Sequence, residues 1–389
     1  MNKQNIVTAL LGIVVFFISA GLSYFAFSNF APSKKVASVP SQTPGAAGQL
    51  VFDTTAPKTE TCPLNGVLYS KQQKDWWGKH RPLGIMIENH ENSKPQSGIS
   101  FADVVYEVVA EGGITRFLNV YYCQDAGFVG PVRSARTYFL DFISEYGSFP
   151  LYAHVGGANQ PGPADALSQI EDYGWGGYND MNQFSIGFPT FWRDYNRLGH
   201  PTSTEHTMYS TTQKLWDFAK SSRGLTNLDK EQNSWDQNFV SYSFKDDASL
   251  ADRPAAEKVH FEFWSSLPDY FVDWVYDKAG NVYKRLNGGK PHIDLDTNKQ
   301  LSAKNLVALF MRERNAFDGY ENNIHLLYGT KGTGKALIFL DGKKIEGTWR
   351  KDKRTARTLL FDQNGEAVKF DRGNIWFSIM PTDAKVLEN

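Results

Sequence analysis

The pattern of apolar and polar positions changes sharply within the first sixty residues of the chain. Residues 6–30 are mostly apolar and contain no charged side chain. This run is longer than the roughly 20 residues that a helix needs to cross the hydrocarbon core of a bilayer. It is also longer than the apolar region of a typical cleaved signal peptide. The pattern therefore predicts an uncleaved transmembrane anchor over residues 6–30.

The flanks of this run bear on its orientation. Lys3 precedes it, and Lys34 and Lys35 follow it, so the basic residues alone do not decide the topology. Only residues 1–5 precede the run, whereas 359 residues (389 − 30) follow it. Because long domains translocate largely regardless of charge, we expect a short cytoplasmic end and a single-pass protein of the cell membrane. The cytoplasmic membrane is then a predicted partner, and the bulk of the chain is extracytoplasmic.

Residues 31–61 are rich in Pro, Ser, Thr, Ala and Gly and show no sustained period, which predicts a flexible linker. Short apolar runs then predict strands over 83–88, 103–111 and 114–123, with Gly112-Gly113 as a two-residue hairpin turn. In the simplest register of that hairpin, Glu107 and Glu111 share one face with Arg116. Two carboxylates and one guanidinium would then meet.

Helical spacing follows the hairpin. A helix is predicted from a cap at Ser134 to about residue 146, then a strand over 151–155, and further helices over 164–172 and 212–221. This succession predicts an α/β domain over residues 62–250, with a mixed sheet and flanking helices.

The composition turns polar after residue 220, and a second domain is predicted over residues 251–389. Gly-containing turns separate six apolar runs in this range. The predicted strands are 259–264, 271–276, 282–286, 336–340, 345–350 and 375–379. With one helix near 303–312, this part is predicted to be a smaller, mainly antiparallel β domain of α+β type.

Composition narrows the function classes. The 10 Trp, 18 Tyr and 27 Phe supply more apolar area than a disordered chain carries. With 41 basic and 42 acidic residues the chain lacks the basic excess of nucleic-acid-binding proteins, and we expect no nucleic-acid partner. The only two cysteines, Cys62 and Cys123, are too few for a disulfide-rich scaffold, and whether they pair stays open.

Two segments imitate ligand-binding motifs. Residues 329–336 have the spacing of a phosphate-binding loop, but Ala336 replaces the magnesium-binding Ser or Thr, and a strand rather than a helix is predicted to follow. Asp294 and Asp296 resemble the start of a calcium loop, but Lys299 stands where glycine is needed. The eight histidines show no ligand spacing. We therefore expect no nucleotide, no metal and no cofactor.

The candidate binding residues are Arg116, Arg133, Ser134, Arg136 and His154. Arg133 and Arg136 flank the predicted start of a helix, where free amides and the helix dipole favour an anion. Guanidinium groups add forked donors that match phosphate or carboxylate. His154, before two glycines at a strand end, could face the same cleft as an acid or base. This set predicts a site for an anionic ligand.

Three hypotheses remain open. The first is a membrane-anchored module that binds an anionic envelope ligand or partner without chemistry. The second is an envelope enzyme acting on phosphate or glycan bonds, with Glu107, Glu111 or His154 handling protons or a metal. The third is a structural interaction protein, in which Arg116 simply pairs with Glu107 or Glu111, while Arg133 and Arg136 bind loop carbonyls.

The strings RPLGIMIENHENSKPQSGIS, ADVVYEVVAEGGITRF and GPVRSARTYFLDFISEYG closely resemble the YerB-like bacterial lipoprotein family of unknown function. A later string resembles the C-terminal companion domain of the same family: TGKALIFLDGKKIEGTWRKDKRTARTLLFDQNGEAVKFDRGNIWFSIMP. Together the resemblance covers about residues 81–381. It implies an exported, membrane-tethered protein but no reaction. The chain departs from the lipoprotein pattern by its predicted transmembrane anchor and its lack of an acylated cysteine.

A looser likeness is to the LytR-CpsA-Psr envelope enzymes. Only a proline-arginine strand-to-helix element over residues 131–136 and a later strand ending in Gly-Gly are similar. This likeness implies that Arg133 and Arg136 face an anionic envelope ligand.

Overall fold

The computed structural model describes residues 49–255 and 257–388. The predicted cytoplasmic end, the predicted anchor over 6–30 and much of the predicted linker lie outside these ranges. Within them, no helix is both long and apolar enough to cross a bilayer. Strand β1 (Lys58–Thr61) lies inside the range predicted as a linker and pairs with β2 (Leu68–Ser70).

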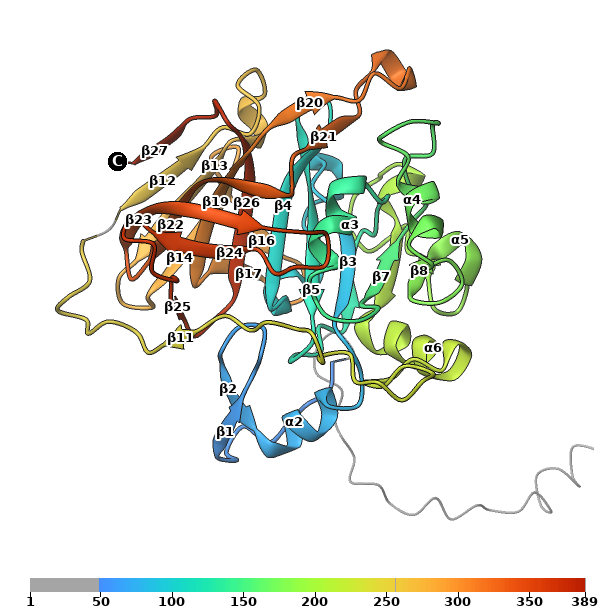
Figure 1. Ribbon diagram of the computed structural model, residues 1–389, viewed down its shortest axis with the longest axis horizontal. Helices are drawn as coiled ribbons and strands as arrows, with labels where there is room; N and C mark the ends of the chain where they lie inside the picture. Colours follow the sequence, from blue (N-terminus) through green and yellow to red (C-terminus); the bar gives the residue numbers. More distant parts are fainter. Residues whose placement is uncertain (1–48, 256, 389) are drawn as a thin grey trace, which may run out of the picture. The chain divides into compact units, whose positions relative to one another are not determined.

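A ten-stranded mixed sheet runs through the fold, in the order β24-β23-β22-β19-β26-β4-β5-β3-β7-β8 (Figure 1). Its first five strands in this order are Leu359–Asp362, Lys343–Lys351, Gly332–Leu340, Asn305–Met311 and Ile375–Pro381. The other five are Val104–Glu111, Ile114–Tyr121, Leu83–Glu88, Leu151–His154 and Asp180–Asn182. The mixed sheet is thus confirmed, and it contains strands from both ranges that the sequence assigns to separate domains.

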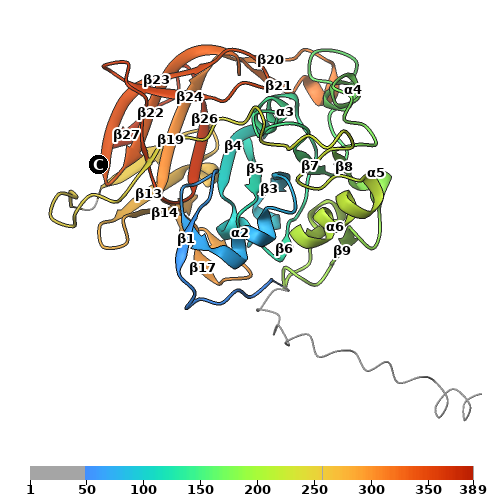
Figure 2. The ribbon, with the colours of Figure 1, turned by 60° about the horizontal axis from the view of Figure 1, so that its bottom comes forward.

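Short helices accompany the strands of the first half. They are α2 (Lys71–Trp77), α3 (Thr137–Ile143), α4 (Ala166–Asp172), α5 (Gln183–Ile186) and α6 (Thr212–Arg223). Figure 2 shows α3 to α6 gathered around the β3–β7–β8 end of the sheet, whereas strands make up its other end. The helices predicted over 164–172 and 212–221 correspond to α4 and α6.

Helix α3 begins later than predicted. Its N-cap is Arg136, which makes no capping hydrogen bond, so the prediction that Ser134 caps the helix is wrong. The preceding segment is extended instead: Val132 forms a bridge with Ile87, and Ala135 forms one with Gly157. Backbone pairing to neighbouring strands therefore holds residues that the sequence places in the first turn.

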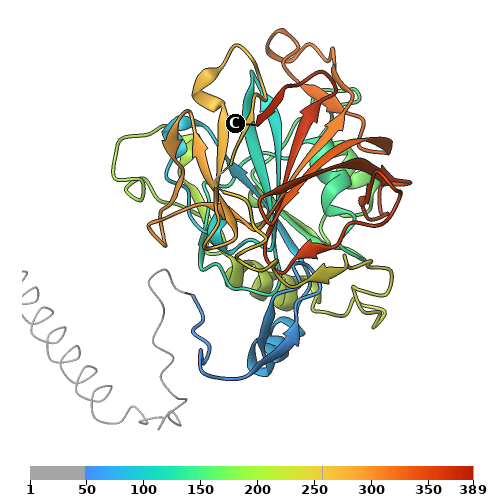
Figure 3. The same ribbon diagram turned by 90° about the vertical axis from the view of Figure 1, so that its left-hand side faces the viewer.

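A smaller antiparallel sheet, β15-β14-β13-β12-β27, packs on the central sheet (Figure 3). In this order the strands are Lys290–Pro291, Val282–Asn287, Val272–Asp277, Lys258–Phe261 and Val386–Glu388, and a sixth strand, β18 (Ser302–Ala303), also pairs with β14. Trp274 of β13 packs edge-on against Trp376 of β26, with ring centroids 5.1 Å apart. The antiparallel pairing predicted from the turns is found here.

The predicted helix near 303–312 is wrong. Residues Asn305–Met311 form β19, every residue of which is buried between β22 and β26. A strand covered on both faces reads as a continuous apolar run, and periodicity cannot separate such a run from a buried helix.

The remaining elements are short. The strands are β6 (Phe128–Val129), β9 (Trp192–Arg193), β10 (Met208–Thr211), β11 (Phe244–Lys245), β16 (Ile293–Asp294), β17 (Lys299–Gln300), β18 (Ser302–Ala303), β20 (Glu313–Asn315), β21 (Leu326–Tyr328), β25 (Phe370–Asp371). Single-turn helices are η1 (Glu91–Ser93), η2 (Ile99–Phe101), η3 (Thr204–His206), η4 (Pro268–Tyr270) and η5 (Tyr320–Asn322). Cys62 and Cys123, both buried, form a disulfide that ties the segment after β1 to the end of β5.

Candidate functional site

The β4–β5 hairpin forms as predicted, but its register differs. Across the two strands, Glu107 pairs with Phe117 and Val108 pairs with Arg116, because a β-bulge lies just before Glu111. Since paired residues of an antiparallel ladder point to the same side, the bulge places Glu107 and Arg116 on opposite faces. The prediction that Glu107 shares a face with Arg116 is therefore wrong.

Glu107 lies in the core between the two sheets. Its side chain is fully buried, and Oε1 accepts hydrogen bonds from Arg285 Nη2 at 2.7 Å and Thr115 Oγ1 at 2.9 Å. Its Oε2 accepts from the indole N–H of Trp376 at 3.0 Å. These contacts make Glu107 part of a buried ion pair, and Glu107 is not among the residues that line a cavity with Arg116 or Arg133.

Arg116 and Arg136 converge on Glu111. Arg116 Nη2 lies 3.2 Å from Glu111 Oε2, and Arg136 Nη2 contacts the other carboxylate oxygen. Each arginine also reaches the backbone: Arg116 Nη1 donates to the carbonyl of Ser134 at 3.0 Å, and Arg136 Nη1 to that of Ala135 at 2.6 Å. Both side chains are buried, and burial lowers the pKa of each guanidinium. These two arginines link Glu111 to the extended segment before α3.

Arg133 has a different environment. Its Nε lies 3.0 Å from Glu88 Oε1, an ion pair without hydrogen-bond geometry, and its side chain is 26% exposed. On the other side of the same carboxylate, His206 Nδ1 lies 2.7 Å from Glu88 Oε2. Burial alone would raise the pKa of Glu88, but the His206 hydrogen bond and the Arg133 charge lower it overall. Glu88 is therefore an ionised carboxylate that contacts both Arg133 and His206.

His154 is fully buried at the end of β7. Its Nε2 lies 2.6 Å from Asp180 Oδ1, and its Nδ1 lies 2.6 Å from the carbonyl oxygen of Gly156. Both ring nitrogens are thus occupied by neighbouring residues, and the structure does not bring His154 to a cleft with the arginines.

A cavity of about 600 Å³ lies beside the extended segment before α3. Arg133, Ser134, Gly156, Arg193 and Glu205 are among the residues that line it. We name it the arginine cavity. Its volume lies within the range of small-molecule sites. Two arginines and one glutamate give its wall an excess of positive charge.

Glycines shape the part of the arginine cavity wall next to the segment that carries Arg133. Gly156 has φ +57°, in the left-handed region, and a Cβ at Gly157 would lie 2.8 Å from Leu167 Cδ2 and 3.1 Å from the Cβ of Ala135. Backbone rather than side chain therefore forms this part of the wall. The Gly-Gly pair that the sequence shows after β7 thus allows the extended segment before α3 to pack closely here.

Of the predicted binding residues, Arg133 and Ser134 line the arginine cavity, whereas Arg116, Arg136 and His154 are not among its lining residues. Glu88, Arg193 and His206 are not among the site residues predicted from the sequence. One signal was present for Glu88, because a carboxylate that closes a buried apolar strand needs a cationic partner. No local pattern indicates Arg193 and His206, which lie in β9 and η3, far along the chain from Arg133.

Comparisons with known proteins identify relatives of the whole described fold. Residues 66–226 match the N-terminal domain, and residues 259–377 the C-terminal domain, of a family described as protein of unknown function DUF3048. The chain is 29% identical over 322 residues to the putative lipoprotein YerB of Bacillus subtilis (strain 168), covering 82% of this chain and 86% of that protein.

A crystal structure of the YerB protein from Bacillus subtilis superposes with a TM-score of 0.68 at 24% identity, covering 85% of this chain and all of that one. At this identity the superposition shows a shared fold. The likeness to LytR-CpsA-Psr enzymes is not shown by these matches.

Proposed function

The chain belongs to the DUF3048 family, and from this premise we propose that it is an envelope-associated protein that binds an anionic ligand in the arginine cavity. The ligand carries phosphate or carboxylate groups. The likeness to a putative lipoprotein supports the envelope location. The Cys62–Cys123 disulfide supports it independently, because disulfides persist in oxidising compartments outside the cytoplasm.

The observation that carries the binding proposal is the state of Arg133. Its guanidinium makes one ion pair through Nε, and within the described residues its two terminal nitrogens donate to no other group. A partly buried guanidinium with free donors at a cavity wall favours an anion that accepts a forked pair of hydrogen bonds. Arg193, on the same wall, adds a second cation.

The proposal is tested by titrating the full-length protein with inorganic pyrophosphate at two salt concentrations. We expect Arg133→Ala to weaken binding by about tenfold or more, since a charge-assisted hydrogen bond contributes roughly 1.5–3 kcal/mol. Arg314→Ala is the matched control, because Arg314 is an exposed arginine on β20 outside the arginine cavity. Equal affinity in wild type and Arg133→Ala would remove the arginine cavity from consideration.

For the tether, we propose that residues 6–30 anchor the protein and that the described residues lie outside the cytoplasmic membrane. Protease added to intact spheroplasts should then digest the C-terminal part, and metabolic labelling with a fatty-acid analogue should leave the chain unlabelled. A protected C-terminal part contradicts the orientation, and a lipid label contradicts the type of anchor.

No contact among the described residues specifically favours the catalytic hypothesis. Glu107, Glu111 and His154 are each bound by neighbouring protein groups, and none is among the residues that line the arginine cavity. We therefore propose binding without assigning a reaction to this site.

A further inference from the structure

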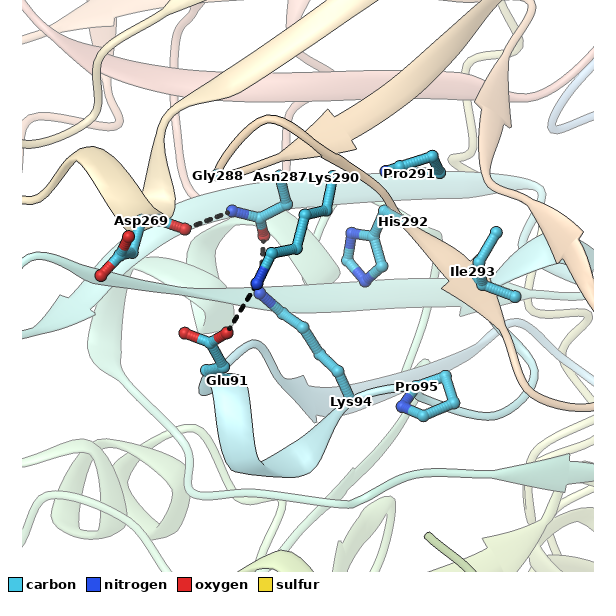
Figure 4. A pocket seen from close by; sticks show the side chains of 10 residues that line it. All are labelled: Glu91, Lys94, Pro95, Asp269, Asn287, Gly288, Lys290, Pro291, His292 and Ile293. Carbon is cyan, nitrogen blue, oxygen red and sulfur yellow. Dashed lines mark hydrogen bonds and ion pairs between the residues drawn. The ribbon is translucent and has the colours of Figure 1, made fainter. Parts of the chain in front are cut away.

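A second cavity, of about 520 Å³, lies where the segment after β3 meets the smaller sheet (Figure 4). Lys94, which follows η1, extends into it together with Lys290 of β15. Glu91 and Asp269 contribute carboxylates, and Asn287 closes one side. We name it the lysine cavity. The inference drawn from it does not rest on the function proposed for the arginine cavity.

The amine of Lys94 has a neutral partner. Its Nζ donates to Asn287 Oδ1 at 3.0 Å, and no described carboxylate lies within the 4.0 Å of an ion pair. The orientation of the Asn287 amide is fixed, because its Nδ2 donates to the carbonyl of Asp269 at 3.1 Å. Lys290 provides the contrast: its side chain is 81% exposed, and its Nζ lies 3.7 Å from Glu91 Oε1.

Some charged groups around Lys94 lower its pKa, and others raise it. Burial, followed by the positive charge of Arg285, lowers the pKa of Lys94 to about 8, while Glu91 and Glu107 oppose this and Lys290 adds to it. Arg285 is fully buried behind the lysine cavity, where its Nη2 pairs with Glu107.

His292 also faces the lysine cavity and adds no charge. Its Nδ1 accepts a hydrogen bond from Arg285 Nε at 3.1 Å, which leaves Nε2 to donate to Gln96 Oε1 at 2.7 Å. Burial and the charges of Arg285 and Lys94 hold the pKa of His292 well below its ordinary value. The ring is therefore neutral, with its proton on Nε2.

We propose that Lys94 is a reactive amine that binds a small aldehyde or ketone covalently, as an imine, in the lysine cavity. Lysines become nucleophilic in this way when they are desolvated next to another cation. The volume accommodates a small molecule, and Pro95, Pro291 and Ile293 supply apolar wall for its carbon skeleton.

The chemistry needs no further reactant. The neutral amine attacks the carbonyl carbon, a C–N bond forms as the π bond of the carbonyl breaks, and one N–H proton passes from the nitrogen to the oxygen to give a carbinolamine. Loss of that oxygen as water then leaves the C=N bond, so amine and carbonyl give imine and water without oxidation or reduction.

The test is reductive trapping on the full-length protein. Butanal and glyoxylate serve as neutral and anionic probes, sodium cyanoborohydride reduces any imine, and peptide mass spectrometry measures the labelling rate at each lysine. At about pH 8 roughly half of an amine with this pKa is neutral, against about one in three hundred of an ordinary lysine. We therefore expect Lys94 to be labelled about tenfold or more faster than Lys290 by at least one probe. Labelling of Lys94 no faster than Lys290 by both probes overturns the proposal.

Substitutions separate reactivity from mere accessibility. Asn287→Asp places a carboxylate beside the ammonium and should slow the labelling of Lys94 at least about fivefold at pH 8, with recovery at higher pH. Lys290→Arg is the matched control and should leave the Lys94 rate unchanged. If Asn287→Asp does not fold, the rate of wild-type Lys94 between pH 6 and 11 decides alone. A midpoint near 8 supports the proposal, and one near 10.5 overturns it.

Discussion

At the residue scale, Glu107 and Arg285 form an ion pair that is completely shielded from water. Both side chains are 0% exposed, and 2.7 Å separates Arg285 Nη2 from Glu107 Oε1. The guanidinium also lies over the rings of Phe117, Trp274 and Trp376. Because neither ion reaches water, each depends on the other.

We predict that Glu107→Gln destabilises the protein by about 3–5 kcal/mol, since it leaves the Arg285 cation buried without a counter-charge. The measurement is the free energy of unfolding in urea. The double variant Glu107→Leu with Arg285→Met is the control and should be markedly less destabilised than the single one, because it removes both charges. If Glu107→Gln lowers the free energy of unfolding by less than about 1 kcal/mol, the fold does not depend on this ion pair.

The contacts of individual side chains could be predicted only in part from the sequence, and the bulge before Glu111 shows the reason. A simple hairpin register places Glu107 beside Arg116, but one extra residue reverses the face of everything beyond it. Arg133 and Ser134 could be assigned to a common region because they are adjacent in sequence. His154 and Asp180 come from neighbouring strands of the sheet, and no local pattern indicates that contact.

At the element scale, the disulfide connects two segments that no hydrogen-bonded ladder joins directly. Cys62 follows β1, Cys123 follows β5, and 61 positions separate them in sequence. Asp103 reinforces this junction, since its Oδ2 accepts hydrogen bonds from the backbone N–H groups of Tyr122 and Cys123.

We predict that replacing both cysteines by serine lowers the free energy of unfolding by about 4 kcal/mol, the chain-entropy value for a loop of this length. Urea unfolding of oxidised wild type and the double variant checks this. Wild type unfolded with a reductant should match the variant. A variant as stable as the oxidised protein would show that the segment before β2 is held by packing alone.

Elements themselves were largely predictable where their periodicity is distinct. The range predicted for β3 is the observed one, and the helix predicted over 212–221 is observed as α6, which extends to Arg223. The apolar run of β19 is instead predicted as a helix near 303–312, which is wrong. Its identity as a strand depends on burial by β22 and β26, which are separated from it by many residues.

At the scale of the whole molecule, the two halves share one sheet and one set of buried charges. β26 pairs in parallel with β4, from Ile375 opposite Val104 to Ser378 opposite Glu107. Glu145, just after α3, lies 2.8 Å from Lys351 Nζ and 3.2 Å from Arg357 Nη1, and all three side chains are essentially unexposed. Each half therefore contributes strands and charged side chains that are buried against the other half.

We predict that a fragment ending at residue 250 does not fold by itself. It would expose the backbone edge of β4 and leave Glu107 and Glu145 without their cations, and unpaired edges and buried lone charges both oppose a stable fold. Dispersion of amide resonances and a cooperative urea transition are the measurements. Insertion of a protease site after the exposed Asp252 gives the control, because the nicked chain keeps both halves and should stay folded. A fragment that unfolds cooperatively would instead establish residues 62–250 as an independent domain, and the shared sheet would then be a docking interface between two domains.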